Sequence, residues 1–326
     1  MVGKVTSAEV AERAGVSRSA VSRVFTPGAS ASPATVAKVR QAAAELGYRP
    51  NAIARSLLTG KSRIIGLVVS YLDNHFYPGL IQALSHALQA EGYHILMFMA
   101  APDGHDAVEV VEDILDYQVN GLVLASVTLT SDLAERCRAL GVPVVLLNRR
   151  QGDDDELAAH SDNFAGGKIA AERLIGRGAR RIGHLAGWSG ASTQQEREAG
   201  LRAGLEAHGH ALFAREAGNF SADGAREATR ALFSGARRPD ALFVANDFMA
   251  LIAMDTLRYE LGLSVPGDVA VIGFDDVPAA AWPAYGLTTV RQDTALLTER
   301  TLALLLGRVD GPAAPLPVRL VARQSG

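Results

Sequence analysis

The sequence contains one cysteine, Cys137, in 326 residues, so no disulfide can form within the chain. Chains without disulfides are typical of a reducing compartment, and we interpret Cys137 as a structural residue in a helical stretch. No apolar run approaches the ~20 residues that a membrane-spanning helix needs, and the N-terminus lacks the pattern of a secretory signal. The expectation is a soluble, cytoplasmic protein that makes no contact with a membrane.

The sequence also lacks the residue patterns of common catalytic and metal sites. Gly60-Lys61-Ser62 resembles the end of a phosphate-binding loop, but Arg55 stands where that loop requires glycine, and no strand precedes it. The 8 histidines show neither HExxH nor Cys/His ligand spacing. Asp275 and Asp276 are adjacent, and adjacent carboxylates rarely converge on one glycosidic bond. We therefore expect no catalytic residue, no metal and no cofactor, and predict that the chain is not an enzyme.

Charge is distributed unevenly along the chain. Residues 1–63 contain ten lysines and arginines and three acidic residues, which gives this segment a net charge of +7. The whole chain carries −3, so the remaining residues carry −10. A basic head on an acidic body suggests that the head meets a polyanion and that the body does not.

The first 60 residues show only helical patterns. Thr6-Ser7-Ala8-Glu9 is a capping box that begins a first helix, and Gly15 ends it. Ser17 caps a second helix over residues 18–24. Two short helices joined by such a turn are typical of a helix-turn-helix, in which the second helix enters the major groove of DNA.

The start of that second helix would face the edges of the bases. Arg18 and Ser19 are exposed there, and Arg23, one turn further on, would reach a base or a phosphate; an arginine fork pairs well with guanine. A third helix begins at Ser32-Pro33 and ends at Gly47. A small helical bundle that binds protein is the alternative interpretation, and the charge of +7 favours DNA.

From Ile64 onward the pattern changes to short apolar runs that alternate with amphipathic helices such as 80–91, 166–177 and 249–261. Apolar strands separated by helices are typical of parallel sheets that are covered on both faces. The segment is too long for one such sheet, so we expect two lobes. The expected strands are 64–69, 94–98, 121–125, 142–147, 181–186, 241–244, 269–274 and 318–322.

Polar and aromatic residues follow the predicted strands at their carboxyl ends. Ligands of parallel α/β sheets bind beyond these ends, where residues from distant parts of the chain meet. The mixture suits a sugar, because aromatic rings cover its C–H faces while amide, carboxylate and guanidinium groups bind its hydroxyls. The candidate ligand-binding residues are Asn74, Phe76, Tyr77, Ser126, Asn148, Arg149, Arg197, Phe220, Asn246, Asp275 and Gln292.

Several of these residues have an alternative, purely structural interpretation. Asp275 and Asn246 could cap the helices that follow their strands. Phe220 could belong to the core, and Arg197 could be a solvated helix residue. The joint pattern therefore carries the hypothesis of a binding site better than any single member does.

Three ordered runs carry a family resemblance that then continues through essentially the whole chain. They strongly resemble the lactose-repressor (LacI/GalR) family of transcriptional regulators. The resemblance implies that the chain binds double-stranded operator DNA as a homodimer, or as a tetramer. The runs are Thr6-Ser7-Ala8-Glu9-Val10-Ala11-Glu12-Arg13-Ala14-Gly15-Val16-Ser17, Val21-Ser22-Arg23-Val24 and Gly47-Tyr48-Arg49-Pro50-Asn51-Ala52-Ile53-Ala54-Arg55-Ser56-Leu57.

The resemblance implies a DNA-binding head, residues 1–60, that ends in a hinge helix, residues 51–58. In the family this helix folds on the operator and pairs with that of the dimer mate in the minor groove. Leu57 matches the leucine wedged between the central base pairs, and Ala54 packs beside it. An apolar wedge bends the duplex, and a helix this short is unstable before it binds. Ordinary packing of Leu57 against the body is the alternative.

The implied contacts with DNA come from both the helix-turn-helix and the hinge. Ala20 stands where the family commonly has Thr, and Thr26 where it has Asn, and both changes remove polar contacts to DNA. The residues implied in DNA binding are Thr6, Ser17, Arg18, Ser19, Ser22, Arg23, Tyr48, Asn51, Ala54 and Leu57.

The body, residues 62–326, is similar to the periplasmic sugar-binding proteins whose fold this family uses. The resemblance implies an N-lobe of residues 62–161 plus 293–326 and a C-lobe of residues 162–290, with the ligand between them. The candidate residues look like those of pentose-type binding proteins, except that Asn148 replaces a common acid. A neutral sugar, an anionic sugar and a purine all stay open as effectors.

The predicted fold is a small all-α helix-turn-helix head joined to an α/β, two-lobed, periplasmic-binding-protein-like (type I) domain with parallel sheets. We predict a DNA-binding transcriptional regulator, by family default a repressor, whose operator binding is controlled by a small effector. A solute-binding protein for transport and a sugar-modifying enzyme are the rival classes. The DNA-binding head argues against the first, and the missing acid–base constellation argues against the second.

Overall fold

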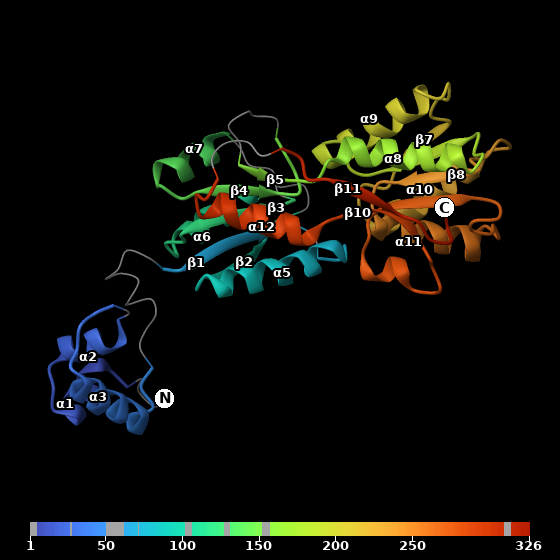
Figure 1. Ribbon diagram of the computed structural model, residues 1–326. Coiled ribbons are helices and arrows are strands. Elements are labelled where there is room, and N and C mark those ends of the chain that lie inside the picture. Colours follow the sequence, from blue (N-terminus) through green and yellow to red (C-terminus); the bar gives the residue numbers. More distant parts are fainter. Residues whose placement is uncertain are drawn as a thin grey trace. The chain divides into compact units, whose positions relative to one another are not determined.

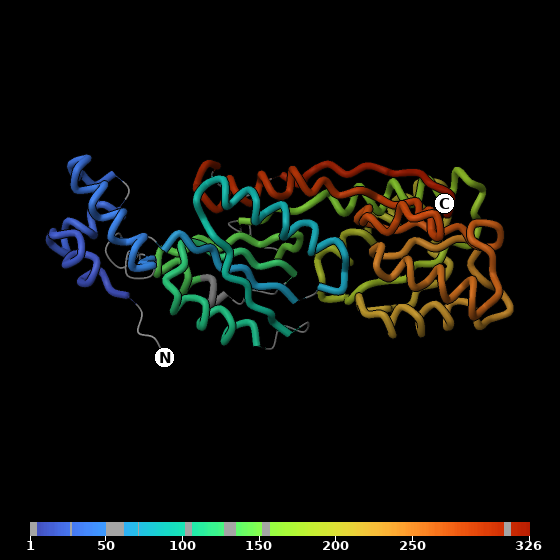
Figure 2. The backbone as a smooth tube through the Cα atoms, turned by 90° about the horizontal axis from the view of Figure 1, so that it is seen from below, coloured from blue at the N-terminus to red at the C-terminus, as the bar shows by residue number. Residues whose placement is uncertain are grey.

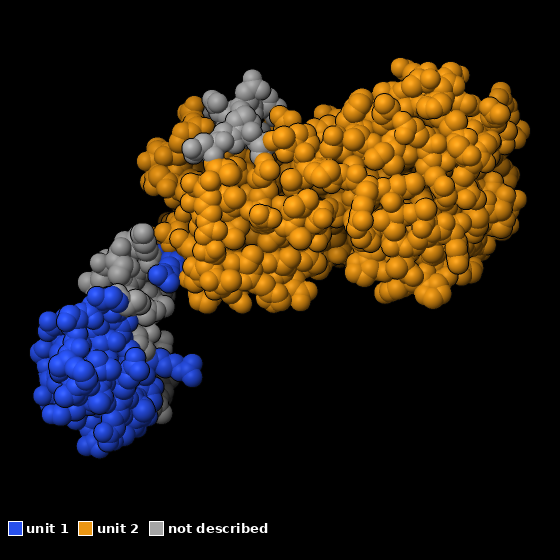
Figure 3. Space-filling model, in the orientation of Figure 1, with its two compact units in different colours: residues 1–63 blue, residues 64–326 orange. Residues whose placement is uncertain are grey.

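In the computed structural model the described residues are 5–26, 28–49, 62–70, 72–101, 106–126, 131–151, 157–309 and 314–326. The chain forms two compact units, residues 1–63 and residues 64–326, which Figure 3 colours separately. Among the described residues, no helix has the length and apolar character needed to span a membrane. The predicted hinge helix, with Asn51, Ala54 and Leu57, lies outside the described residues.

The first unit, the head, is a bundle of three helices whose ends are set by local capping. Thr6 and Glu9 form the predicted capping box, and Gly15 ends the first helix with a φ of 66° that glycine adopts without strain. The side chain of Ser17 accepts a hydrogen bond from the amide of Ala20 in the second helix, and that of Ser32 accepts one from the amide of Thr35 in the third. The helices are α1 (Ser7–Ala14), α2 (Arg18–Phe25) and α3 (Pro33–Leu46).

The second unit, the body, contains two sheets, of which the first is wholly parallel with strand order β2-β1-β3-β4-β5 (Figure 1). Its central strands are buried except for half-buried residues at the starts of β1 and β4, because helices cover both faces. Helices α5 and α12 pack on one face, and α6 and α7 on the other, where Cys137 is buried. The elements are β1 (Ile64–Val69), α5 (Phe76–Ala90), β2 (His94–Met99), α6 (Ala107–Leu115), β3 (Gly121–Ala125), α7 (Ser131–Ala139), β4 (Val144–Leu147), β5 (Ala158–Ala159) and α12 (Thr294–Leu305).

The second sheet has the order β11-β10-β9-β8-β6-β7, and all its pairs are parallel except β10 with β11. Helices α8 and α9 cover one face, and α10 and α11 cover the other. The elements are α8 (Asn163–Gly176), β6 (Ile182–Ala186), α9 (Ser192–Glu206), β7 (Ala214–Ala217), α10 (Ala222–Phe233), β8 (Ala241–Val244), α11 (Asp247–Asp255), the π-helical turn η1 (Thr256–Glu260), β9 (Ala270–Asp275), the 3₁₀ turn η2 (Pro278–Ala281), β10 (Thr288–Gln292) and β11 (Val318–Val321).

The end of the chain differs from the expectation that residues 293–326 belong with the first lobe. Helix α12 does pack on the first sheet, against α5, β3, β4 and β5. The chain then returns, and β11 joins the second sheet by pairing antiparallel with β10 (Figure 2). The reason is that β11 satisfies the backbone groups along the otherwise open edge of β10. The expected assignment of this strand was therefore wrong.

Candidate functional site

The carboxyl ends of strands from both sheets border one cavity in the body. Ser126 follows β3, Asn148 follows β4, Asn246 lies just after β8, and Asp275 is the last residue of β9. The lining side chains lie close together and leave a cavity volume of about 20 Å³. The lining residues are Asn74, Tyr77, Ser126, Asn148, Arg149, Thr193, Arg197, Phe220, Asn246 and Asp275.

The structure brings together all the predicted ligand-binding residues except Phe76 and Gln292. Those two line a neighbouring hollow, which shares Asp275 with the cavity. Thr193 also lines the cavity but was not predicted, although it lies on helix α9, one turn before the predicted Arg197.

Four lining residues adopt a left-handed backbone conformation that side-chain-bearing residues usually avoid. The φ angles are 63° at Ser126, 70° at Asn148, 58° at Phe220 and 124° at Asp275. Each such residue costs on the order of 1–3 kcal/mol and persists only where the surrounding structure enforces it. Strain of this kind gathers at ligand sites, and here it turns each side chain into the cavity at the end of its strand.

Arg197 is the central cation of the site and is 2% exposed. Its Nε donates to Asn163 Oδ1 at 2.9 Å, and its Nη1 donates to the carbonyl of Ala245 at 2.6 Å. Its guanidinium carbon lies 3.6 Å from the ring centre of Phe274, and burial lowers its pKa. The alternative interpretation of Arg197 as a solvated helix residue is therefore wrong.

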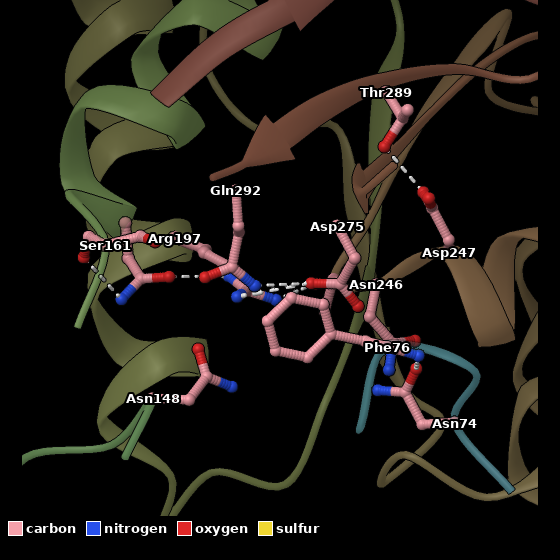
Figure 4. A network of polar contacts seen from close by, with 12 residues as sticks. Asn74, Phe76, Asn148, Ser161, Arg197, Asn246, Asp247, Asp275, Thr289 and Gln292 are labelled. Atoms are coloured by element: carbon pink, nitrogen blue, oxygen red, sulfur yellow. Dashed lines mark hydrogen bonds and ion pairs between the residues drawn. The ribbon is translucent and has the colours of Figure 1, made fainter. Parts of the chain in front are cut away.

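Asp275 faces Arg197 with 3.7 Å between Oδ1 and Nη2 (Figure 4). The same oxygen accepts a hydrogen bond from Gln292 Nε2 at 2.7 Å. Burial raises the pKa of this carboxyl, and Arg197 opposes the rise. The carboxylate of Asp275 therefore interacts with Arg197 and Gln292 within the site.

The side chain of Asn246 has both of its suggested roles. It caps α11 by accepting from the amide of Met249 at 3.0 Å, and it also lines the cavity.

A second carboxyl group, Asp247, lies behind the site and is fully buried. It accepts from Thr289 Oγ1 at 2.6 Å (Figure 4). It also accepts from the amide of Val277 at 2.9 Å. Burial first, and then the charge of Asp275, raise its pKa to about 7. The sequence places Asp247 directly after Asn246, but only the fold reveals that it supports the site from behind.

The wall of the cavity on the side of the first sheet is a short polar network. The hydroxyl of Tyr77 is hydrogen-bonded to Ser126 Oγ and accepts from Asn148 Nδ2 at 2.9 Å. Among the described residues, Asn148 Oδ1 and Arg197 Nη2 are buried without a hydrogen-bond partner. Leaving such groups unsatisfied costs about 1–3 kcal/mol each, so a bound ligand would stabilise this arrangement by supplying a donor and an acceptor.

Arg149 links the two sides of the cavity. Its Nη1 donates to the carbonyl of Ser126 at 2.8 Å, and its guanidinium carbon lies 5.7 Å from the ring centre of Trp188, in the loop after β6. The next amide, of Arg150, donates to Ser192 Oγ at 2.9 Å. These contacts join residues that follow β4 to residues that follow β6, and so hold the two lobes together around the cavity.

In the head, helix α2 presents its predicted DNA-binding side chains to solvent. Arg18, Ser19, Ser22 and Arg23 are exposed, while Val21 on the opposite face is buried. This division is that of a helix packed on one side and free to enter a groove on the other.

The other predicted DNA-binding residues of the head have structural contacts of their own. The hydroxyls of Thr6 and Ser17 both serve as helix caps, and Ser17 Oγ is also hydrogen-bonded to Ser19 Oγ. Tyr48 is half-buried, and its ring centre lies 5.8 Å from that of Phe25. These residues therefore position the DNA-binding face as well as bordering it.

The head and the body together define a class of protein, in which a helix-turn-helix is joined to a ligand-binding unit of two parallel sheets. Residues 6–51 match the family model of bacterial regulatory proteins of the lacI family, and residues 171–325 match a periplasmic binding protein-like domain. The ribose operon repressor of Escherichia coli strain K12 is 32% identical over 310 residues, which are 94% of this chain and 94% of that protein. The chain belongs to the lacI family of bacterial transcriptional regulators.

Solved structures that resemble the whole chain include two regulators bound to small molecules. The complex of the transcriptional regulator CelR with cellobiose has 32% sequence identity and a TM-score of 0.73, and the match covers 99% of this chain and 100% of that one. The Lac repressor dimer bound to operator and the anti-inducer ONPF has 31% identity and a TM-score of 0.88, covering 99% of both chains. The helix-turn-helix head and the two-sheet body are therefore those predicted from the sequence.

Proposed function

We propose that this chain is a transcriptional repressor whose affinity for its operator is set by a small neutral sugar bound in the cavity. The observation that carries the proposal is the convergence of amide, carboxylate, guanidinium and aromatic groups from the strand ends of both sheets on one cavity. Aromatic faces suit the C–H surfaces of a sugar, and the polar groups suit its hydroxyls. The cellobiose bound to CelR agrees with a sugar as the class of ligand.

The electrostatics of the cavity favour a neutral ligand over a sugar acid or a phosphorylated sugar. Arg197 already donates to two acceptors of the protein and faces Asp275. Arg149 already donates to the carbonyl of Ser126. Within the described part of the chain, Arg197 Nη2 has no hydrogen-bond partner and can donate to a ligand oxygen, but Asp275, 3.7 Å away, would repel the carboxylate or phosphate of an anionic ligand.

The size of the cavity favours one sugar ring over two. The cavity volume is about 20 Å³, far below the roughly 300–1,000 Å³ of small-molecule sites, so the side chains already lie close together and even one ring requires the lobes to separate. A second ring would require the lobes to separate further.

On the DNA side, we propose that α2 enters the major groove with Arg18 and Ser19 toward the base edges. The exposure of these side chains supports the assignment. Two heads of a homodimer would read a near-palindromic site, as a two-fold dimer requires, with the segment 51–58 as hinge and Leu57 as wedge. Such a role implies that the protein works in the cytoplasm, where its operator is.

We propose that the ligand leaves the cavity chemically unchanged. Among the described residues that line it, Asp275 is the one carboxylate, and it is engaged by Arg197 and Gln292. Hydrolysis of a glycosidic bond usually needs two carboxyl groups on opposite sides of that bond. The arrangement therefore favours binding over catalysis.

The test begins with thermal unfolding of the full chain in the presence of D-ribose, D-xylose, D-glucose, cellobiose, D-gluconate, ribose 5-phosphate and hypoxanthine. A ligand that binds the folded state raises the unfolding midpoint. Operator sequences are then selected from a random duplex pool, and the affinity for them is measured with and without each ligand that binds. We expect a neutral monosaccharide to raise the midpoint and to weaken operator binding.

The conservative variant Tyr77→Phe tests the site itself. It removes the hydroxyl that contacts Ser126 and Asn148 and keeps the buried ring. We expect sugar affinity to fall about tenfold, which corresponds to the free energy of one hydrogen bond. Tyr93→Phe, at a half-buried position that does not line the cavity, is the matched control. Binding of hypoxanthine or ribose 5-phosphate alone, or release of a modified sugar, would contradict the proposal.

A further inference from the structure

One wall of the cavity is the ring of Phe220, which packs against a glycine, Gly187. Gly187 is buried and lies directly after β6, and the ring of Phe220 packs against it. A Cβ atom on Gly187 would lie 2.1 Å from Cζ of Phe220, 2.4 Å from Cε1 and 2.5 Å from Cε2, whereas ordinary contact begins at 3.4 Å. The ring therefore occupies the space that any other residue at position 187 would fill.

The backbone of Gly187 is held in place by a buried polar chain. Its amide donates to Gln194 Oε1 at 2.6 Å, and Gln194 is 1% exposed. The Nε2 group of Gln194 lies 3.0 Å from His184 Nε2 and 2.9 Å from Glu198 Oε2. Burial lowers the pKa of His184 to about 4, so this histidine is neutral at pH 7 and its Nε2 accepts from Gln194. Gly187 is thus a fixed surface for the ring.

The base of Phe220 is fixed as well. Asn219 and Phe220 adopt successive φ angles of 51° and 58°, in a turn between β7 and α10. The amide of Gly218 donates to the carbonyl of Ala186 at 2.8 Å, and the amide of Ser221 donates to the carbonyl of Gly218 at 3.0 Å. A strained turn held at both ends leaves the ring few positions, and the cavity is the open side, because the ring also packs against the core.

We propose that Gly187 is a specificity-determining positioning residue. It leaves room for the ring of Phe220 and thereby sets the size of the sugar that the cavity accepts. This inference rests on the proposed function of the cavity as a sugar site. A side chain at position 187 pushes the aromatic ring toward the ligand. The larger of two sugars loses more affinity than the smaller, although residue 187 itself contacts Phe220 and not the ligand.

The test uses sugars that differ only by a hydroxymethyl group, namely D-xylose against D-glucose and D-ribose against D-allose. Dissociation constants are measured by calorimetry on the full chain for the wild type and for Gly187→Ala. We expect the preference for the pentose of a pair to rise roughly tenfold or more, the discrimination typical of one methylene-sized group. Phe220→Leu, which shortens the wall, shifts the preference toward the hexose, and the double variant returns toward the wild-type ratio.

A matched control separates this effect from a general loss of stability. The control is Gly183→Ala, in the strand β6 that precedes Gly187; a Cβ at position 183 would lie 2.8 Å from Leu242 Cδ2, in the core and not in the cavity. It lowers the unfolding midpoint without changing the ratio of sugar affinities. If Gly187→Ala does not fold, the pentose-to-hexose affinity ratio of Phe220→Leu still tests whether this ring limits the size of the sugar.

An unchanged pentose-to-hexose ratio in Gly187→Ala or in Phe220→Leu overturns the inference and leaves the sugar site standing. A wild-type chain that binds none of the four sugars overturns the proposed function, and the inference falls with it. Rescue of Gly187→Ala by Phe220→Leu is the result that only the seating of the ring explains.

Discussion

The two compact units place their candidate functional side chains in opposite environments. In the head, Arg18 and Ser19 are exposed on α2, and the buried core is a separate set of small apolar residues around Val21 and Val39. In the body, Arg197 and Asp275 are among the most buried polar residues of the chain. The head therefore separates the groups that would bind from those that hold the fold, and the body combines them.

The difference has an energetic consequence. A buried polar group is stabilising only while its partners are present, and removal of one partner leaves the other desolvated and unsatisfied. An exposed side chain has water as an alternative partner, so its removal changes stability little. Substitutions at the cavity should therefore affect folding and binding together, and substitutions on the exposed face of α2 should affect binding alone.

The largest effect is expected from Arg197→Met, which removes the buried cation and leaves Asp275 without its charge partner. Loss of one member of a buried pair costs about 3–5 kcal/mol of unfolding free energy. Both tryptophans, Trp188 and Trp282, lie in the body, so denaturant unfolding followed by tryptophan fluorescence reports on this unit.

The control for this change is Arg202→Met, on the same helix α9. Arg202 is 48% exposed and pairs with Glu198 one turn away. We expect a change within about 0.5 kcal/mol, as for most surface substitutions. Equal losses in the two variants would refute the contrast between buried and exposed cations.

The next effect is expected from Asp247→Asn and depends on pH. Because burial raises the pKa of Asp247 to about 7, the folded body holds a proton there more tightly than the unfolded chain, in which the ordinary value is 3.8. The resulting stability is fully present below the ordinary pKa and is lost as pH rises through the window between these two values. Asp247→Asn resembles the protonated carboxyl, so the variant should gain stability relative to the wild type from pH 4.5 to pH 7.5.

The measurement is the difference in unfolding free energy between Asp247→Asn and the wild type at several pH values. Asp223→Asn, whose side chain is 90% exposed on α10, serves as the control for the loss of one carboxyl. A difference that stays constant across this window, or that moves in the opposite direction, would show that Asp247 does not hold a proton in the folded body.

How far the sequence predicts the structure also differs between the units. In the head, the signals are local: the Thr6–Glu9 capping box and Ser32-Pro33 begin helices at the expected residues. In the body, buried strands such as β3 and β8 coincide with their apolar runs, but the partner of β11 depends on long-range pairing that no local pattern encodes.

The cavity was largely predictable because parallel strands bring their carboxyl ends to one edge of a sheet. Of the three residues that were not predicted, only Thr193 lines the cavity itself. Thr193 lies on a helix, Asp247 supports the site from behind, and Gly187 acts through Phe220. That the predicted residues bind a ligand stays a prediction for the experiments above.

In the head, Val39→Ala tests how much the small hydrophobic core contributes to the stability of the three-helix bundle. Val39 is 0% exposed in a cluster whose other buried members include Val10 and Val21. Truncation of this side chain should lower the unfolding free energy of the head by about 2 kcal/mol, which is large for so small a unit. Hydrogen exchange of the full chain should speed up at the amides of α1–α3 and stay unchanged in the body. Lys38→Ala, on the exposed face of α3, is the control.

A smaller effect is expected from Ser32→Ala, which removes the cap of α3. Its hydroxyl accepts from the amide of Thr35 at 3.2 Å, and loss of such a cap typically costs about 1 kcal/mol. Ser30→Ala, at an exposed position just outside the helix, lacks this role. Protection of the first-turn amides of α3 against hydrogen exchange distinguishes the two variants, and equal protection in both would show that the cap does not contribute.

The smallest effect on stability is expected from Arg18→Ala. The side chain is exposed at the start of α2, so the unfolding free energy of the head should change by less than about 0.5 kcal/mol. Affinity for the selected operator should nevertheless fall by about 1–3 kcal/mol, and discrimination at one base pair of each half-site should relax, because a base contact and not only charge is lost. Arg40→Ala, an exposed cation on α3, should weaken all sequences more evenly if it contacts phosphate, and should change nothing if it does not. If Arg18→Ala destabilised the head as Arg197→Met destabilises the body, the two units would not differ in how they combine binding and folding.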